Sequence, residues 1–149
     1  MFPNLNLPKA NLKLSKKDNK IYVWCISRKK KLVLTPEEWV RQHLIHYLVE
    51  FKKIPLSLIA SEIEITANKQ KRRCDLVIYN LEKIPEILIE CKAPEIKLNQ
   101  KVVQQIIHYN NQLKVPVIAI SNGIQHEIIE VNYETGEFKK LEDFFKLNS

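Results

Sequence analysis

The chain has 149 residues, of which 45% are hydrophobic, and this is enough for one domain with a buried core. The formal net charge of +7 favours a polyanionic partner, and no run of about 18 apolar residues is present to cross a membrane. Because the chain has only two glycines, it contains no glycine-rich phosphate-binding loop, and we expect no nucleotide cofactor.

The cysteines are few and odd in number: Cys25, Cys74 and Cys91. No Cys-x-x-Cys pair is present, so the sequence predicts a reducing compartment without disulfides or a zinc site. The first residues lack the charged and apolar segments of a signal peptide. We therefore expect a cytoplasmic protein with no membrane partner.

Residues 1–19 are polar and are expected to form an arm, and residues 20–149 a single domain with its core at about 35–132. Residues 21–27 and 32–34 predict a β-hairpin around a basic turn. The turn predicts contacts to nucleic-acid phosphates through Arg28, Lys29 and Lys30. The alternative is a hairpin tip that only faces water.

Thr35-Pro36 predicts a helix start, with Thr35 as N-cap and a capping box to Glu38. The stripe expected to be buried consists of Val40, Leu44, Tyr47, Leu48 and Phe51. Helical spacing places Glu37 on that stripe and Glu38 on the opposite side. Glu37 is then either a partner of the helix dipole or a third carboxylate of a metal site. His43 and His46 are expected to be partly exposed.

A strand is predicted over 56–65, followed by a polar loop over 66–72. This loop and the next residue supply four candidate phosphate contacts, namely Lys69, Lys71, Arg72 and Arg73. The alternative is again a solvated turn.

Two aliphatic runs, 73–79 and 86–92, are separated by a loop that contains Asn and Pro, and they predict a hairpin. If the loop is central, residues whose numbers sum to 165 face each other. Asp75 then faces Glu90, and Tyr79 faces Glu86. Directly opposed side chains lie ~5 Å apart, and like charges at that distance are destabilising.

Lys92 lies two residues beyond Glu90, so a strand places both on one face. Two carboxylates are suitable oxygen ligands for Mg²⁺ or Mn²⁺, and the lysine suits a role in handling a nucleophilic water. Ile89 and Cys91 are expected on the other face, with Cys74 opposite Cys91. A slip of one residue in register would separate the acids.

The remaining pattern predicts a helix from Asn99 to Leu113, a fully buried strand over 115–120 that suits parallel pairing, a hairpin over 125–139 and a terminal helix over 141–147. The helix stripe expected to be buried consists of Leu98, Val102, Ile106, Tyr109 and Leu113, with Gln105 at its edge. Together these elements predict an α/β fold.

Five segments resemble, in order, the domain at the N-terminus of type I restriction enzyme R subunits, which is grouped with the PD-(D/E)xK, restriction-endonuclease-like nucleases. They are Thr35–Gln42, Arg73-Cys74-Asp75, Ile89–Pro94, Gln105–Asn110 and Ser121-Asn122-Gly123. A departure from the family pattern is Cys74, which stands where the nominal motif has Pro.

The resemblance implies a mixed central sheet flanked by helices with an αβββαβ core. It also implies a metal-dependent endonuclease with Asp75 and Glu90 as ligands and Lys92 as the base. Glu37 would be a further acid, and Gln105 a helper in the active site. The expected partner is DNA, with a homodimer left open. The alternatives are a nucleic-acid-binding module of the same fold that does not cleave, or a structural, partner-binding protein.

Overall fold

The computed structural model describes residues 2–67 and 69–142. It contains two α-helices, two short 3₁₀ helices and nine strands in the described part of the chain. The helices are α1 (Pro36–Glu50), η1 (Leu56–Leu58), α2 (Gln100–Asn110) and η2 (Asn111–Leu113). The strands are β1 (Leu14–Lys17), β2 (Lys20–Cys25), β3 (Lys30–Val33), β4 (Ile59–Ala67), β5 (Gln70–Tyr79), β6 (Pro85–Cys91), β7 (Val117–Ser121), β8 (His126–Val131) and β9 (Phe138–Leu141).

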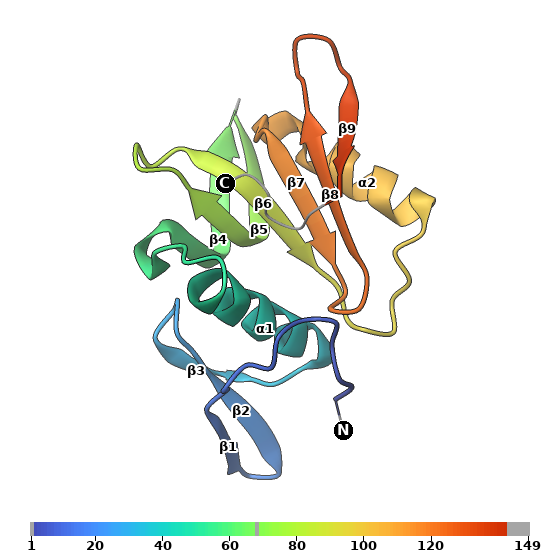
Figure 1. The fold of residues 1–149 in the computed structure, drawn as a ribbon. Helices are drawn as coiled ribbons and strands as arrows, with labels where there is room; N and C mark the ends of the chain where they lie inside the picture. The colour runs from blue at the N-terminus through green and yellow to red at the C-terminus, as the bar shows by residue number, and fades with distance from the viewer. Residues whose placement is uncertain (1, 68, 143–149) are drawn as a thin grey trace.

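Two sheets enclose α1. A small antiparallel sheet has the order β1-β2-β3, and a six-stranded sheet has the order β4-β5-β6-β7-β8-β9. Figure 1 shows α1 between these sheets and α2 on the other face of the large one. The predicted α/β class is confirmed, and the large sheet is mixed because β6 and β7 run parallel while its other neighbours are antiparallel.

The start of α1 follows the sequence signal. The backbone N–H of Glu38 donates a hydrogen bond to Thr35 Oγ1 at 3.1 Å, which caps the helix as predicted. The predicted orientation of the first-turn acids was wrong, because the side chain of Glu38 is 8% exposed and that of Glu37 is 47% exposed. The Glu38 carboxylate accepts hydrogen bonds from Arg41 and Gln42.

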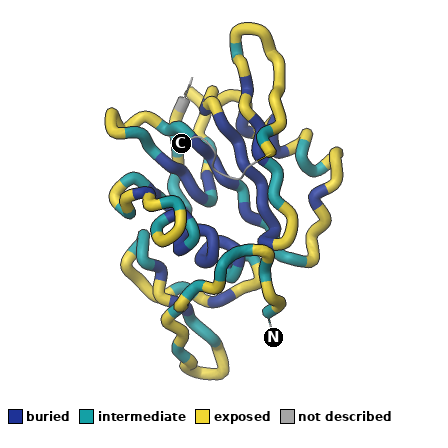
Figure 2. The backbone as a smooth tube through the Cα atoms, viewed as in Figure 1, coloured by how far each residue is buried: buried dark blue, intermediate teal, exposed yellow. Residues whose placement is uncertain are grey.

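Burial of α1 extends around most of its circumference, as the dark tube at the centre of Figure 2 shows. The expectation of partly exposed histidines was therefore wrong: His43 and His46 are both buried. For His43, the ring of Trp39 packs edge-on at 4.3 Å between the centroids, and Leu5 and Leu7 of the N-terminal segment line a pocket beside both rings. Phe51 lies beyond the last helical turn and is 56% exposed, contrary to its place in the predicted stripe.

The residues before α1 are more ordered than an arm followed by a two-stranded hairpin. They contribute an additional strand, β1, within the range expected to be an arm. Ahead of it, the ring of Phe2 stacks on Trp39, with 5.3 Å between the ring centroids. The backbone N–H of Asn6 donates to the Gly123 carbonyl at 2.8 Å, which ties the N-terminal segment to the turn between β7 and β8.

The predicted basic loop over 66–72 was wrong, because β4 and β5 continue through most of it. Pairs run from Ile59 opposite Ile78 to Ala67 opposite Gln70, so only two residues connect the strands. Extended pairing places Arg72 and Arg73 on opposite faces of a strand rather than together on a loop.

The β5–β6 hairpin has the predicted register over three pairs, from Leu76 opposite Ile89 to Ile78 opposite Ile87. The register shifts at the next pair, where Tyr79 faces Pro85 rather than Glu86. A bulge at this point absorbs one residue of the connecting loop and leaves the other end of the hairpin in the predicted register.

The strand β7 is buried at every residue and pairs in parallel with β6, as its continuous apolar run predicts. The helix α2 is capped by Asn99, whose Oδ1 accepts from the backbone N–H of Val102 at 2.9 Å. Tyr109 was expected in its buried stripe but is 48% exposed, while Ile107 is buried.

The predicted terminal helix over 141–147 falls mostly outside the described residues, and Leu141 itself ends β9. Within the described part of the chain, neither helix combines the length and the apolar character needed to span a bilayer.

Candidate functional site

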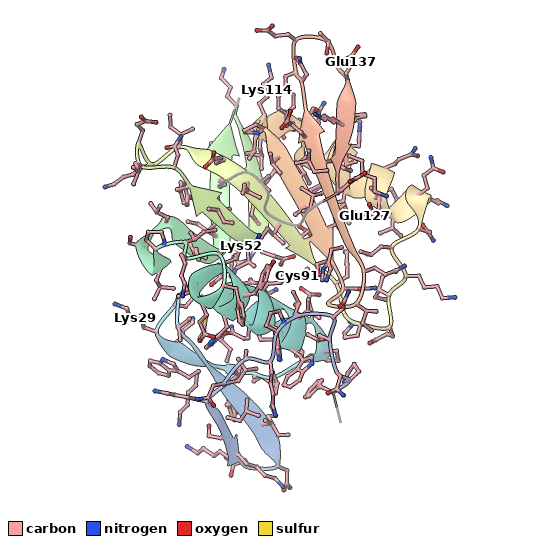
Figure 3. All side chains as sticks on the ribbon, in the orientation of Figure 1. Lys29, Lys52, Cys91, Lys114, Glu127 and Glu137 are labelled. Atoms are coloured by element: carbon pink, nitrogen blue, oxygen red, sulfur yellow. The ribbon has the colours of Figure 1, made fainter. Side chains whose placement is uncertain are left out.

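The two predicted carboxylates meet where β5 and β6 separate. The last regular pair is Leu76 opposite Ile89, one residue short of Asp75 and Glu90. Beyond it, the backbone N–H of Cys91 donates to Asp75 Oδ2 at 2.8 Å. The Asp75 carboxylate thus accepts the hydrogen bond that a backbone carbonyl would accept in a regular strand pair. Asp75 therefore lies in the opening between the strands. Cys91 is labelled at this point in Figure 3.

The surroundings of Glu90 disfavour ionisation of its carboxyl group. Burial is the main cause, the negative charge of Asp75 the next, and together they raise the pKa of Glu90 to about 8. A hydrogen bond between the Glu90 and Asp75 carboxyl groups acts in the same direction, and Lys92 opposes it. Glu90 therefore carries a proton at neutral pH unless a further cation neutralises the pair.

Lys92 and Glu37 complete the group of charges at this point. Lys92 lies just past β6, where its backbone N–H donates to the Ser121 carbonyl at 2.8 Å. Its positive charge acts on both Glu90 and Glu37. The pKa of Glu37 is raised, first by burial and then by Asp75, while Arg41 and Lys92 lower it. The structure therefore brings Glu37, Asp75, Glu90 and Lys92 within electrostatic range of one another.

Arg41 is the central residue that the sequence-based prediction missed. Its guanidinium, with a side chain 5% exposed, pairs with four carboxylates: Glu37 at 3.0 Å, Glu38 at 2.5 Å, Glu62 at 2.7 Å and Asp75 at 3.0 Å. Burial alone would lower the pKa of Arg41, but nearby negative charges, Glu38, Asp75 and Glu62 among them, outweigh it and raise that pKa above its usual value. Arg41 thus neutralises the acids on the α1 side of the site.

A signal for Arg41 was present in the sequence. It lies among apolar residues of α1, four residues after Glu37 and three after Glu38, which are the spacings at which helix side chains meet. An arginine inside an apolar helical pattern and close to two acids indicates a buried ion pair. Its link to Asp75 and Glu62 depends on the sheet and has no local signal.

The predicted facing of Cys74 and Cys91 was wrong. Cys74 packs with Val77 and Leu88, whereas Cys91 packs in the cluster that faces α1. Burial raises the pKa of Cys74 to about 11, with Glu90 and then Asp75 contributing. Cys74 thus lies on the face of the sheet away from α1, on the same side as Ile63.

Gln105 lies apart from these acids. It is exposed on α2 and lines a groove of about 440 Å³ that none of the site carboxylates lines. Arg72 borders the same groove, where its guanidinium lies 4.6 Å from the centre of the Tyr109 ring. Arg72 also donates to Gln112 Oε1 at 3.0 Å, so it is held against α2.

The other basic candidates differ in how free their charges are. Arg73 donates twice to Glu62 Oε2, at 3.0 and 2.9 Å, so its charge is partly matched. Arg28 is half-buried, and its charge lowers the pKa of Glu62. The remaining candidates are exposed: Lys29, Lys30, Lys69 and Lys71.

The metal-binding capacity rests on two carboxylates. Across residues 2–67 and 69–142, no group of three or more His, Cys, Asp or Glu is placed to hold a metal ion. The hypothesis of Glu37 as a third ligand therefore has no support, since Glu37 pairs with Arg41 instead. Mg²⁺ nevertheless suits one or two carboxylates together with waters and phosphate oxygens. The half-buried Asp75–Glu90 pair, with a raised Glu90 pKa, fits a divalent cation.

Comparison with known proteins gives two findings and one negative result. A family model described as the type I restriction enzyme R protein N terminus (HSDR_N) matches residues 36–144. A solved fragment of a putative HsdR subunit of a type I restriction enzyme from Vibrio vulnificus YJ016 is 24% identical, with a TM-score of 0.39.

That alignment covers 58% of this chain and 18% of the Vibrio chain. No curated protein matches. Because this family model matches most of the sequence, the chain belongs to the family of type I restriction enzyme R protein N-terminal domains.

Proposed function

We propose that this chain is a Mg²⁺-dependent phosphodiesterase that cleaves DNA in a restriction-modification system, with the core of a PD-(D/E)xK nuclease. The observation that carries the proposal is the pairing of Asp75 and Glu90 in the opening between β5 and β6, with the charge of Lys92 acting on the same carboxyl group. Membership of the family supports the restriction role.

Each residue of the pair has a distinct task in this proposal. Asp75 is fixed by Arg41 and by the backbone N–H of Cys91, yet each carboxylate oxygen retains a lone pair for a metal ion. Glu90 would give up its proton to solvent on binding a divalent ion and serve as the second ligand. The bound Mg²⁺ would polarise the scissile phosphate and acidify a coordinated water.

Lys92 serves the water and the phosphate. In this proposal its ammonium group orients the attacking water and stabilises charge that develops on the phosphate oxygens. The Lys92 backbone is fixed to β7 through Ser121. Glu37 completes the charge balance at the N-terminus of α1, and Gln105 contacts the DNA strand from α2.

The test is cleavage of supercoiled plasmid in Mg²⁺ or Mn²⁺. Wild type should nick the plasmid, and Glu90→Gln and Lys92→Ala should each lower the rate at least ~100-fold. Glu95→Gln is the matched control, because this acid is exposed and lies four residues past Cys91, in the segment that follows β6. Equal activity in all four proteins would indicate a contaminating nuclease and contradict the proposal.

A second candidate is a domain of the same fold that binds nucleic acid without cleaving it. The observation that favours it is Arg41, which already pairs with Asp75 at 3.0 Å and supplies positive charge to the site. This candidate predicts salt-dependent DNA binding, no turnover in any divalent metal and no rise in melting temperature with Mg²⁺. Work with the other subunits of a type I enzyme is a further proposal that the family name supports.

A further inference from the structure

The positive charge of the chain is concentrated before α1. Nine of the 24 Lys and Arg residues, but one of the 17 acids, lie in residues 1–34. That segment therefore carries a net charge of +8, and the rest of the chain a net charge of −1. The strands β1, β2 and β3 belong to this segment and precede the residues that the family model matches.

The small sheet has one buried face and one open face. Val23 and Cys25 are 0% exposed and lie on the α1 side. Because side chains alternate along a strand, Tyr22 and Trp24 lie on the other side. We call this second side the outer face. Trp24 is 37% exposed and the neighbouring Val33 is 46% exposed.

The register places lysines on both sides of Trp24. Lys31 is its partner on β3, and the Trp24 backbone N–H donates to the Lys13 carbonyl at 2.9 Å on the β1 side. Both lysines are exposed. Tyr22 lies two residues along the same strand, ~7 Å from Trp24. The outer face thus carries two aromatic rings in a row, with ammonium groups beside the first.

This combination suits one kind of partner. Aromatic rings on an open sheet face stack on unpaired bases, and flanking lysines neutralise the phosphates between them. A duplex keeps its base faces stacked internally and cannot use the rings in this way. Among the described residues, neither Tyr22 nor Trp24 stacks on another aromatic side chain.

We propose that the outer face of the β1–β2–β3 sheet binds single-stranded nucleic acid, with bases stacked on Trp24 and Tyr22 and phosphates held by Lys13 and Lys31. This surface is separate from the Asp75–Glu90 site and does not depend on cleavage. It gives the chain a means of holding an unpaired strand.

The test is fluorescence anisotropy of a labelled oligothymidine of about 15 nucleotides, in EDTA and at fixed low salt. Trp24→Ala should weaken binding roughly 10-fold, whereas Trp24→Phe should stay within about threefold of wild type. Binding of a duplex should be the same for wild type and Trp24→Ala. Glu90→Gln should bind as wild type does, which separates this surface from the cleavage site.

The matched control is Phe138→Ala, which removes a 60% exposed aromatic ring beside Lys139 and Lys140 on β9. It should leave single-strand binding unchanged. The proposal is overturned if Trp24→Ala binds the oligonucleotide as tightly as Phe138→Ala does, or if it loses single-strand and duplex binding equally.

A second readout uses the wild-type side chain. The chain has two tryptophans, so Trp39→Phe leaves Trp24 as the sole tryptophan reporter. Its fluorescence should be quenched by the oligonucleotide, as expected for a base stacked on the ring. An unchanged emission at saturating oligonucleotide would overturn the stacking arrangement.

Discussion

Arg41 holds together acids from three separate elements. Its buried guanidinium joins Glu37 and Glu38 on α1 to Glu62 on β4 and Asp75 on β5. Removal of one partner from a buried ion pair leaves an uncompensated charge in a poorly solvated place. The stability of the site therefore depends on this one cation more than on any of the individual acids.

Arg41→Met should lower the free energy of unfolding by about 3–5 kcal/mol, because Glu38 and Asp75 lose their buried counter-charge. Arg41→Lys should also destabilise the protein, since one ammonium group cannot replace the planar guanidinium contacts. Urea unfolding at pH 7 measures both. Arg73→Met is the control, because that side chain is 62% exposed and should cost less than ~1 kcal/mol. Equal losses in Arg41→Met and Arg73→Met would contradict the assigned role.

Glu90 makes stability depend on pH in a definite direction. Its pKa is about 8 in the folded chain against an ordinary value of 4.5. As pH rises, the unfolded state loses this proton first, so the folded state loses relative stability between pH 4.5 and pH 8. Below that window the burial of a neutral carboxyl group carries no such penalty.

Glu90→Gln should therefore stabilise the protein, on the order of 4 kcal/mol at pH 8 and close to zero at pH 4.5. Melting temperatures measured in EDTA across this range would show a difference that grows with pH. Glu95→Gln, at an exposed position, should show no such trend. A Glu90→Gln effect that is constant with pH would be inconsistent with a raised Glu90 pKa.

At the scale of elements, the N-terminal segment is attached to the large sheet through the turn between β7 and β8. Gly123, with φ +87°, accepts from Asn6, and a Cβ atom there would lie 2.7 Å from Leu5 Cδ2. Gly136 has a similar φ of +75° but nothing within 4 Å of such an atom. A side chain at either glycine would therefore strain the left-handed backbone, but only at Gly123 would it also clash with a neighbouring residue.

Gly136→Ala should cost about 1 kcal/mol from the left-handed backbone alone. Gly123→Ala should cost more, because Leu5 must move as well, and it should speed proteolysis within residues 2–12. Thermal melts and limited trypsin digestion measure the two effects. If both variants melt alike and are cut alike, the contact between the N-terminal segment and this turn contributes nothing to stability.

At the scale of the whole molecule, the charge is divided between two regions of opposite sign. The segment before α1 has a net charge of +8 and the remainder −1, so a polyanion is attracted to the small sheet and less so to the large one. The total of +7 understates how positive this sheet is.

A triple variant with Lys16, Lys17 and Lys20 changed to Gln should elute from heparin at clearly lower salt than wild type, because it loses clustered positive charge. The control changes Lys83, Lys97 and Lys139 to Gln, which lowers the net charge equally at scattered exposed positions. It should elute close to wild type. Identical elution of the two variants would show that total charge, rather than its position, governs binding.

The sequence by itself determined what depends on neighbours along the chain. Thr35 and Asn99 cap helices because their oxygens reach N–H groups three residues away. The pairing of Leu76 with Ile89 follows from alternation and a short loop, and the family membership was likewise predictable from the order of five short motifs.

Only the tertiary structure decided which surfaces are covered and which strands separate. Trp39 and the N-terminal segment lie against His43, and Glu38 is buried beside Arg41, although periodicity assigns both side chains to the solvent side of α1. Cys74 and Cys91 lie in different clusters, and Arg41 on α1 reaches Asp75 on β5. The Arg41–Asp75 contact joins residues 34 positions apart, and no local pattern of hydrophobicity or charge encodes such a contact.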